Sequence, residues 1–153
     1  MANDSVGTTV ILIRHAERNN SPTADPGPHL NAAGRARAQS LIHVFGKSSI
    51  EAIYTSHFTR SKETAQPLAA HLNNLATTQM DEALEIKNDI LANHQGKTVV
   101  VIGHSDTVPD LINLLDGGNM PVINDSEFDN LFIVTVLGSS KASVTGLKYG
   151  EPS

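Results

Sequence analysis

The sequence VILIRHAERNN, from Val10 to Asn20, places an apolar run directly before a cluster of charged side chains. Residues 8–13 are continuous and mostly β-branched or apolar, which is typical of a strand buried on both faces, as in a parallel sheet. A buried strand normally ends in a turn, whereas this one ends in Arg14 and His15. We therefore ask what chemistry places charge at the end of a strand.

The rest of the chain alternates between strand and helix patterns. A loop rich in proline and glycine, residues 16–30, follows the first strand, and Asn31 is a plausible N-cap for the helix that comes next. We expect strands over residues 8–13, 52–55, 76–80, 98–102, 131–137 and 142–148, and helices over 31–46, 59–72, 83–96 and 106–115.

Strands separated by helices favour an α/β fold. Such an order predicts a three-layer α/β/α sandwich with a mainly parallel central sheet, because each crossover helix must cover one face of the sheet. The last two strands have no helix between them, so we expect them to pair as an antiparallel edge. The length of 153 residues fits one domain over residues 1–153.

The composition excludes several classes of protein. The net charge of −5 argues against a general nucleic-acid binder, and the chain has no cysteine for a disulfide, a thiolate nucleophile or a Cys-based metal site. Its apolar runs are too short to cross a membrane, and its first residues lack the features of a signal peptide. We expect a cytoplasmic protein without membrane or nucleic-acid partners. A leader removed before residue 1, and the oligomeric state, are left open.

Three stretches of polar residues follow the predicted parallel strands. Arg14 and His15 follow the first strand, residues 56–60 follow the second, and residues 103–105 follow VVVI. Ligands of parallel α/β sheets bind beyond the carboxyl ends of the strands. The set His15, His104, Arg14 and Arg60 gathered there suits a phosphoryl group, because guanidinium groups pair with its oxygens and a neutral imidazole can attack phosphorus. The helix that follows residue 105 would add backbone N–H groups.

Four segments together resemble one family. The stretches LIRHAE, HLNAAGRARA, YTSHFTRSKETA and VVVIGHS, between Leu12 and Ser105, are similar in order and spacing to the histidine phosphatase superfamily, which has the phosphoglycerate-mutase-like fold. The RHG-type signature of that family is RHA here. The resemblance implies a metal-independent phosphatase that needs no cofactor, and the sequence agrees in that its histidines lack metal-ligand spacing.

The resemblance also implies roles for particular residues. His15 corresponds to the nucleophile that becomes phosphorylated, and Arg14 and Arg60 correspond to the phosphate clamp. His104 corresponds to the second histidine, which hydrogen-bonds the transferred group.

Two further substrate-binding residues are suggested beside that set. Arg18 lies where some branches of the family keep another phosphate-contacting arginine, and Ser105 can offer its hydroxyl or its backbone N–H. Glu17 is expected to orient arginines or to cap structure, and His57 lies inside the stretch YTSHFTRSKETA.

The general acid is the least defined member of the predicted site. Larger members of the family carry it in an insertion between the segment of the second arginine, here Arg60, and the second histidine, here His104. In this chain the interval between those two residues is short. Glu82 is the tentative acid, with Glu85 and Asp106 as alternatives. A small member without the acid fits a leaving group that departs easily, and phosphohistidine on another protein is the known example.

We therefore predict a phosphatase that works through a phosphohistidine intermediate, with a phosphorylated small molecule or a phosphohistidine protein as its partner. The alternatives are a phosphatase for small-metabolite phosphomonoesters, a mutase, and a catalytically weak module that binds phosphate or phosphoproteins. A histidine-dependent metal binder is the remaining alternative, and the sequence favours it least.

Overall fold

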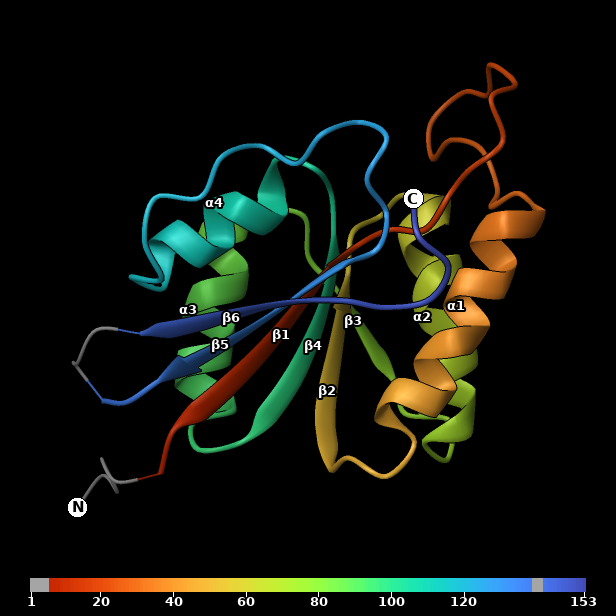
Figure 1. Cartoon of the computed structure of the whole chain (residues 1–153). Coiled ribbons are helices and arrows are strands. Elements are labelled where there is room, and N and C mark those ends of the chain that lie inside the picture. Colours follow the sequence, from red (N-terminus) through yellow and green to blue (C-terminus); the bar gives the residue numbers. More distant parts are fainter. Residues whose placement is uncertain (1–5, 139–141) are drawn as a thin grey trace.

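The computed structural model describes residues 6–138 and 142–153 of the chain. The elements follow the predicted order (Figure 1). The strands are β1 (Thr8–Arg14), β2 (Ile50–Thr55), β3 (Thr77–Gln79), β4 (Thr98–Gly103), β5 (Asn130–Val136) and β6 (Ser143–Lys148). The helices are α1 (Ala32–Phe45), α2 (Thr59–His71), α3 (Ala83–Asn93) and α4 (Thr107–Leu114).

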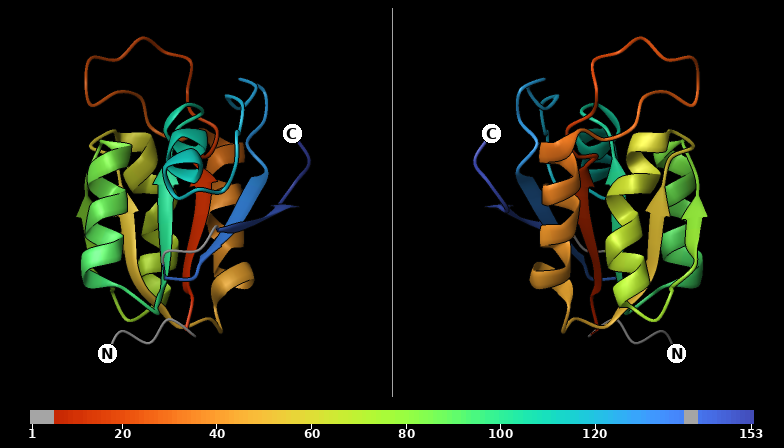
Figure 2. Two further views of the ribbon diagram at one scale, coloured as in Figure 1. Left: turned by 90° about the vertical axis from the view of Figure 1, so that its left-hand side faces the viewer. Right: turned by 90° about the vertical axis from the view of Figure 1, so that its right-hand side faces the viewer.

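The sheet confirms the predicted fold class. Its strand order is β3-β2-β4-β1-β5-β6. The pairs β1–β4, β2–β4 and β2–β3 are parallel, whereas β1–β5 and β5–β6 are antiparallel, so the antiparallel strands form one edge. Helices α1 and α2 cover one face of the sheet and α3 and α4 the other, which gives three layers (Figure 2).

The alternating direction of the side chains along β1 explains why this strand is largely apolar. Val10 and Leu12 belong to the core cluster that includes residues of α3 and α4, and Ile11 and Ile13 belong to the cluster that includes residues of α1 and α2. Successive side chains of a strand point to opposite faces, so a strand covered on both sides needs apolar residues at every position. The two core clusters therefore account for the apolar residues of β1, and its pairing with β4 continues to Arg14.

The start of α1 is fixed by two local features. Asn31 caps the helix as predicted, because its side-chain oxygen accepts the Gly34 N–H at 2.9 Å. A Cβ atom at Gly34 would lie 2.0 Å from the Glu17 carbonyl oxygen, so only glycine allows this close approach. The helix is thus pressed against the segment that leaves β1, next to the predicted site.

The predicted boundaries differ from the structure by a few residues. Strand β2 begins at Ile50 rather than at residue 52, and β4 extends through Gly103. The loop 16–30 projects beyond the sheet (Figure 1) and contains an isolated bridge between Arg18 and Leu30. None of the helices in residues 6–138 and 142–153 combines the length and apolar character that spanning a membrane requires.

Candidate active site

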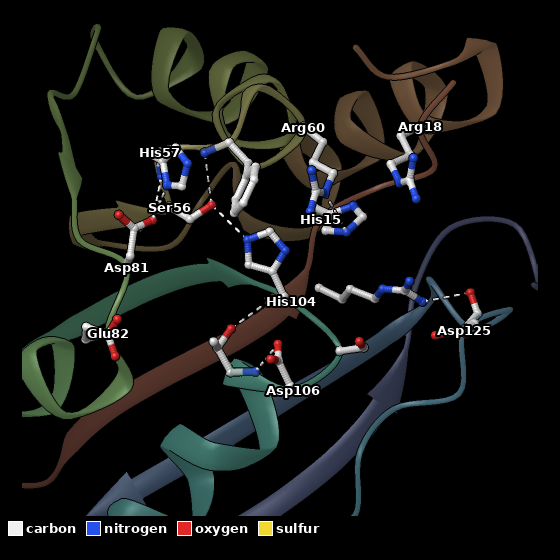
Figure 3. A pocket seen from close by; sticks show the side chains of 14 residues that line it. His15, Arg18, Ser56, His57, Arg60, Asp81, Glu82, His104, Asp106 and Asp125 are labelled. Carbon is white, nitrogen blue, oxygen red and sulfur yellow. Dashed lines mark hydrogen bonds and ion pairs between the residues drawn. The ribbon is translucent and has the colours of Figure 1, made fainter. Parts of the chain in front are cut away.

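The carboxyl ends of β1, β2 and β4 open into a pocket of about 730 Å³ (Figure 3). Every residue predicted to bind or transfer phosphate lines it: Arg14, His15, Arg18, Arg60, His104 and Ser105. The structure therefore brings these residues together although they come from separate segments. The parallel register explains this convergence, because Arg14 and Gly103 are partners where β1 and β4 end.

His15 is held with one ring nitrogen facing a backbone carbonyl and the other facing an arginine. Its Nδ1 lies 2.8 Å from the Ala16 carbonyl oxygen, and the Arg60 Nε–H donates to its Nε2 at 3.2 Å. A carbonyl only accepts and a guanidinium only donates, so the proton lies on Nδ1 and Nε2 carries the lone pair. The side chain is buried, and its backbone N–H bonds to Gly103. His15 thus presents a fixed nucleophilic nitrogen.

His104 lies beside His15, with 5.1 Å between the ring centroids. Its Nε2 is 2.8 Å from the Ser56 hydroxyl, and the other ring nitrogen faces the His15 side of the pocket (Figure 3). When the Ser56 hydroxyl donates to Nε2, the proton of a neutral His104 resides on Nδ1. That N–H is then able to donate to an oxygen of a bound phosphoryl group.

Both rings are held in the neutral state. Burial, helped by His104 and the neighbouring arginines, lowers the pKa of His15 to about 3. Burial and the Arg60 charge lower the pKa of His104 to about 4. A neutral imidazole keeps the lone pair that a nucleophile needs, so the site suits attack on phosphorus near neutral pH.

These lowered pKa values predict a specific pH response. The unfolded chain takes up protons at His15 and His104 near pH 6.5, whereas the folded protein does not, so folding stability falls as the pH drops below 6.5. We expect a loss of about 2 kcal/mol for each ring at pH 5. Histidine NMR titration with unfolding curves at pH 7 and pH 5 measures both effects. A ring that titrates near pH 6.5 contradicts the expectation.

Arg14 is fixed by the segment that precedes β5. Its Nη1 donates to the backbone carbonyls of Asn124 at 3.3 Å, Asp125 at 3.0 Å and Glu127 at 2.8 Å. Its guanidinium lies 4.0 Å from the centre of the Phe128 ring. The buried Nε has no hydrogen-bond partner within the part of the chain that the structure describes. An unpaired, buried and charged donor in the pocket wall fits an anion as its partner.

Arg60 and Arg18 differ in how tightly they are placed. Arg60 bonds His15 and lies 4.3 Å from the centre of the Phe58 ring, so its position is set by both neighbours. Arg18 is exposed, and its Nη1 contacts the Asn19 carbonyl at 3.4 Å. Arg18 thus stands at the rim of the pocket, which fits its predicted secondary role.

The first amides of helix α4, which we expected to offer backbone N–H groups to an anion, are partly engaged within the protein. The Thr107 N–H donates to the Asp106 carboxylate at 2.8 Å. The next amide, of Val108, donates to the His104 carbonyl at 3.1 Å. Asp106 therefore caps α4, and these two amides are already satisfied. Ser105 lines the pocket, and its carbonyl accepts the Ile123 N–H at 2.9 Å.

The three acid candidates are placed differently. Glu82 lines the pocket from the turn before α3, on the far side of His104 from His15 (Figure 3). Glu85 lies in the first turn of α3, outside the pocket lining. Asp106 lines the pocket but serves as the cap of α4. Glu82 is thus the candidate that lines the pocket and has no capping bond.

Sequence reasoning missed the residues that support the site. Ser61 is fully buried, accepts the Ser56 N–H at 3.0 Å and donates to the Ile102 carbonyl at 2.8 Å, which ties α2 to β4. Thr64 accepts the Ala16 N–H at 2.9 Å, just beyond His15. The sequence signal that could have found these supports is the presence of two hydroxyl side chains, Ser61 and Thr64, on the apolar face of the predicted helix 59–72.

Two charged pairs complete the surroundings of the site. Glu17, expected to orient arginines or cap structure, binds Arg37 through both carboxylate oxygens at 2.8 and 3.0 Å. Asp81, which the sequence did not indicate, lines the pocket and binds His57. Among the described residues no group of three or more His, Asp or Glu side chains is arranged to hold a metal ion.

Comparison with known proteins identifies a matching family. The model of the histidine phosphatase superfamily (branch 1) matches residues 10–88. The uncharacterized protein Rv0525 of Mycobacterium tuberculosis is 35% identical over 86 residues, which are 53% of this chain and 42% of the relative. The chain thus spans less than half the length of the curated relatives it matches.

Solved structures share the fold at low sequence identity. The protein histidine phosphatase SixA complexed with tungstate has a TM-score of 0.74 at 20% identity, over 92% of this chain and 96% of that chain. Mycobacterial glucosyl-3-phosphoglycerate phosphatase Rv2419c has a TM-score of 0.74 at 13% identity, over 94% and 100%. YhfR of Bacillus stearothermophilus has a TM-score of 0.68 at 18% identity, over 95% and 98%. The predicted phosphoglycerate-mutase-like fold is thereby confirmed.

Proposed function

The chain belongs to the histidine phosphatase superfamily, and on that premise we propose that it is a phosphatase that works through a phosphohistidine intermediate on His15. The observation that carries the proposal is the placement of His15. Its Nε2 lone pair faces the pocket between Arg60 and His104, while Nδ1 is fixed by the Ala16 carbonyl. This arrangement gives the ring a single reactive nitrogen.

In the first step the substrate phosphoryl group binds between the guanidinium groups of Arg14 and Arg60. The Nε2 lone pair of His15 attacks phosphorus, the N–P bond forms, and the bond from phosphorus to the leaving group breaks with its electron pair. The Arg60 Nε–H, no longer accepted by Nε2, turns to a phosphoryl oxygen. The fixed donors stabilise the charge that the transferring group carries.

In the second step water attacks the phosphohistidine. The N–P bond breaks, its electrons return to Nε2 of His15, and inorganic phosphate leaves with the oxygen of water. His104 donates to a phosphoryl oxygen in both steps, and water reaches the pocket past its exposed lining residues Arg18, Glu82 and Asp125. Hydrolysis rather than return of the phosphate to a product is therefore the proposed outcome.

A phosphohistidine protein is the proposed substrate class. An imidazole leaving group departs far more easily than an alkoxide, so a P–N bond needs less acid catalysis than an alkyl phosphate ester. Glu82 is exposed and lies across His104 from the nucleophile (Figure 3), which fits a reaction that gains little from it. SixA, one of the structural neighbours, is named a protein histidine phosphatase.

A small-metabolite phosphomonoester is the second candidate substrate, because Glu82 does line the pocket. We expect Glu82→Gln to lower kcat/KM for an alkyl phosphate by about 10²-fold, the usual contribution of a general acid. The same change should alter kcat/KM for a phosphohistidine peptide by less than about 3-fold. Glu85→Gln is the matched control, because Glu85 lies outside the pocket lining. Equal losses on both substrates contradict this assignment.

The function is tested by measuring phosphate release from a phosphohistidine peptide and from a panel of sugar and aryl phosphates. We expect turnover without added metal, with the highest kcat/KM on the phosphohistidine peptide. Binding of tungstate or inorganic phosphate without turnover of any substrate contradicts the proposal and supports a binding module. A cytoplasmic location is proposed on the sequence alone.

A further inference from the structure

His57 is held between two carboxylates that come from different loops. Its Nδ1 lies 2.9 Å from Asp81 Oδ1 (Figure 3). Its Nε2 lies 2.7 Å from Asp25 Oδ1. Carboxylates accept, and a neutral imidazole has only one N–H, so both bonds form together only with the imidazolium. Asp81 belongs to the turn before α3 and Asp25 to the loop 16–30. The ring thus links three segments around the pocket.

The segment 25–27, which Asp25 begins, rests directly on the start of α2. The Pro26 carbonyl accepts the Thr59 N–H at 3.1 Å. A Cβ atom at Gly27 would lie 3.1 Å from Nη1 of Arg60 and 3.7 Å from the Phe58 ring, at a φ of +93°. The segment therefore packs against the arginine that bonds His15, and the positive φ of Gly27 favours glycine at this position.

We propose that His57 is a positioning residue for Arg60: by joining Asp25 to Asp81 it holds the segment 25–27 against Arg60 and so sets this guanidinium in its phosphate-binding geometry. The inference deepens the proposed function and rests on it. His57 does not need to touch the substrate for this role. Its ring stacks on Phe58, with 4.0 Å between centroids, and Arg60 packs on that same phenylalanine.

The two carboxylate contacts differ in strength. Asp81 Oδ1 also accepts the His57 backbone N–H at 2.8 Å, so this side of the bridge has two bonds. Asp25 has 69% of its side chain exposed, and its one bond to His57 is the part we expect to break first. The hydrogen bonds to Asp81 and Asp25 raise the pKa of His57. The other titratable groups packed on Phe58 are Arg60 and His104. Release is therefore expected at a higher pH than for a histidine without carboxylate partners.

A double-mutant cycle with His57→Ala, Asp25→Ala and the double variant tests the inference. The first readout is amide hydrogen exchange of Thr59, whose N–H bonds the Pro26 carbonyl. The second is the inhibition constant of inorganic phosphate in the phosphatase reaction. We expect each single variant to accelerate the exchange and to weaken phosphate binding by about 3- to 10-fold, the effect of losing one hydrogen bond. The double variant should lose no more than either single one.

Two further variants sharpen the comparison. His94→Ala breaks another histidine–carboxylate pair, His94 with Glu51 at 2.6 Å, outside the pocket lining, and should change neither readout. His57→Arg keeps the charge and two donors, and should restore most of the phosphate affinity. Additive losses in the cycle, or unchanged Thr59 exchange in His57→Ala, overturn the inference. Hydrogen exchange at Thr59 tests the inference even if the protein turns over no substrate. Failure of the inference can therefore be told apart from failure of the proposed function.

Discussion

Replacement of His15 by asparagine should lower kcat/KM by at least about 10⁴-fold, because it removes the atom that takes the phosphoryl group. The asparagine amide can keep the bond that Nδ1 makes to the Ala16 carbonyl at 2.8 Å, so the backbone after β1 stays in place. The variant therefore removes nucleophilicity with little change in packing. Steady-state rates on the best substrate, with circular dichroism of the folded variant, measure the effect.

The matched control is His43→Asn, which changes a histidine on α1 outside the pocket lining. It should retain wild-type kcat/KM within about 2-fold, as is usual for a surface substitution. A His15→Asn variant that keeps more than about one hundredth of the activity contradicts the role of His15, because the residual rate must then come from another nucleophile.

Replacement of Arg60 by alanine should be the second largest effect, a loss of about 10²- to 10³-fold in kcat/KM. Its Nε–H bonds the attacking nitrogen at 3.2 Å before reaction and is released to the phosphoryl oxygens as the N–P bond forms. This donor thus gains most of its interaction in the transition state, so kcat should fall more than KM rises. Arg60→Lys keeps the charge but loses the planar pair of donors, so it should recover only part of the loss.

Arg18→Ala is the control for charge alone. Arg18 also lines the pocket and is exposed, and among the hydrogen bonds of the described residues its side chain makes only the one to the Asn19 carbonyl. Its removal should cost less than about 10-fold, because an exposed charge acts through solvent. Equal losses in Arg18→Ala and Arg60→Ala would mean that the pocket attracts phosphate by net charge and not through a placed donor.

Much of the fold could be predicted because its signals are local. The apolar residues of β1 show its burial on both faces, and Asn31 marks the start of α1 through its capping bond to Gly34. Strand ends were predicted less well. Strand β4 runs through Gly103 because pairing with Arg14 of β1 continues to that point, and such pairing is not visible in the sequence of one strand.

The residues that could act on phosphate were predicted together because chemistry restricts their types and the topology brings strand ends to one edge. Their supports were missed, since these are contacts between distant segments without periodicity. The carbonyls of residues 124, 125 and 127 bind Arg14, and Asp81 binds His57. The start of the helix after residue 105 was expected to offer backbone N–H groups to an anion, whereas its Thr107 amide binds Asp106, one residue earlier. Whether a helix-start amide binds a capping side chain or a ligand depends on the geometry of the folded chain, which the sequence does not show.

The most direct measurement of the central claim is to quench the wild-type protein during turnover and to map the bound phosphate by mass spectrometry. We predict an acid-labile, alkali-stable phosphate on the peptide that contains His15, attached at Nε2 because Nδ1 is engaged with the Ala16 carbonyl. Phosphate on another residue, or full turnover from a protein that never becomes phosphorylated, would contradict the account.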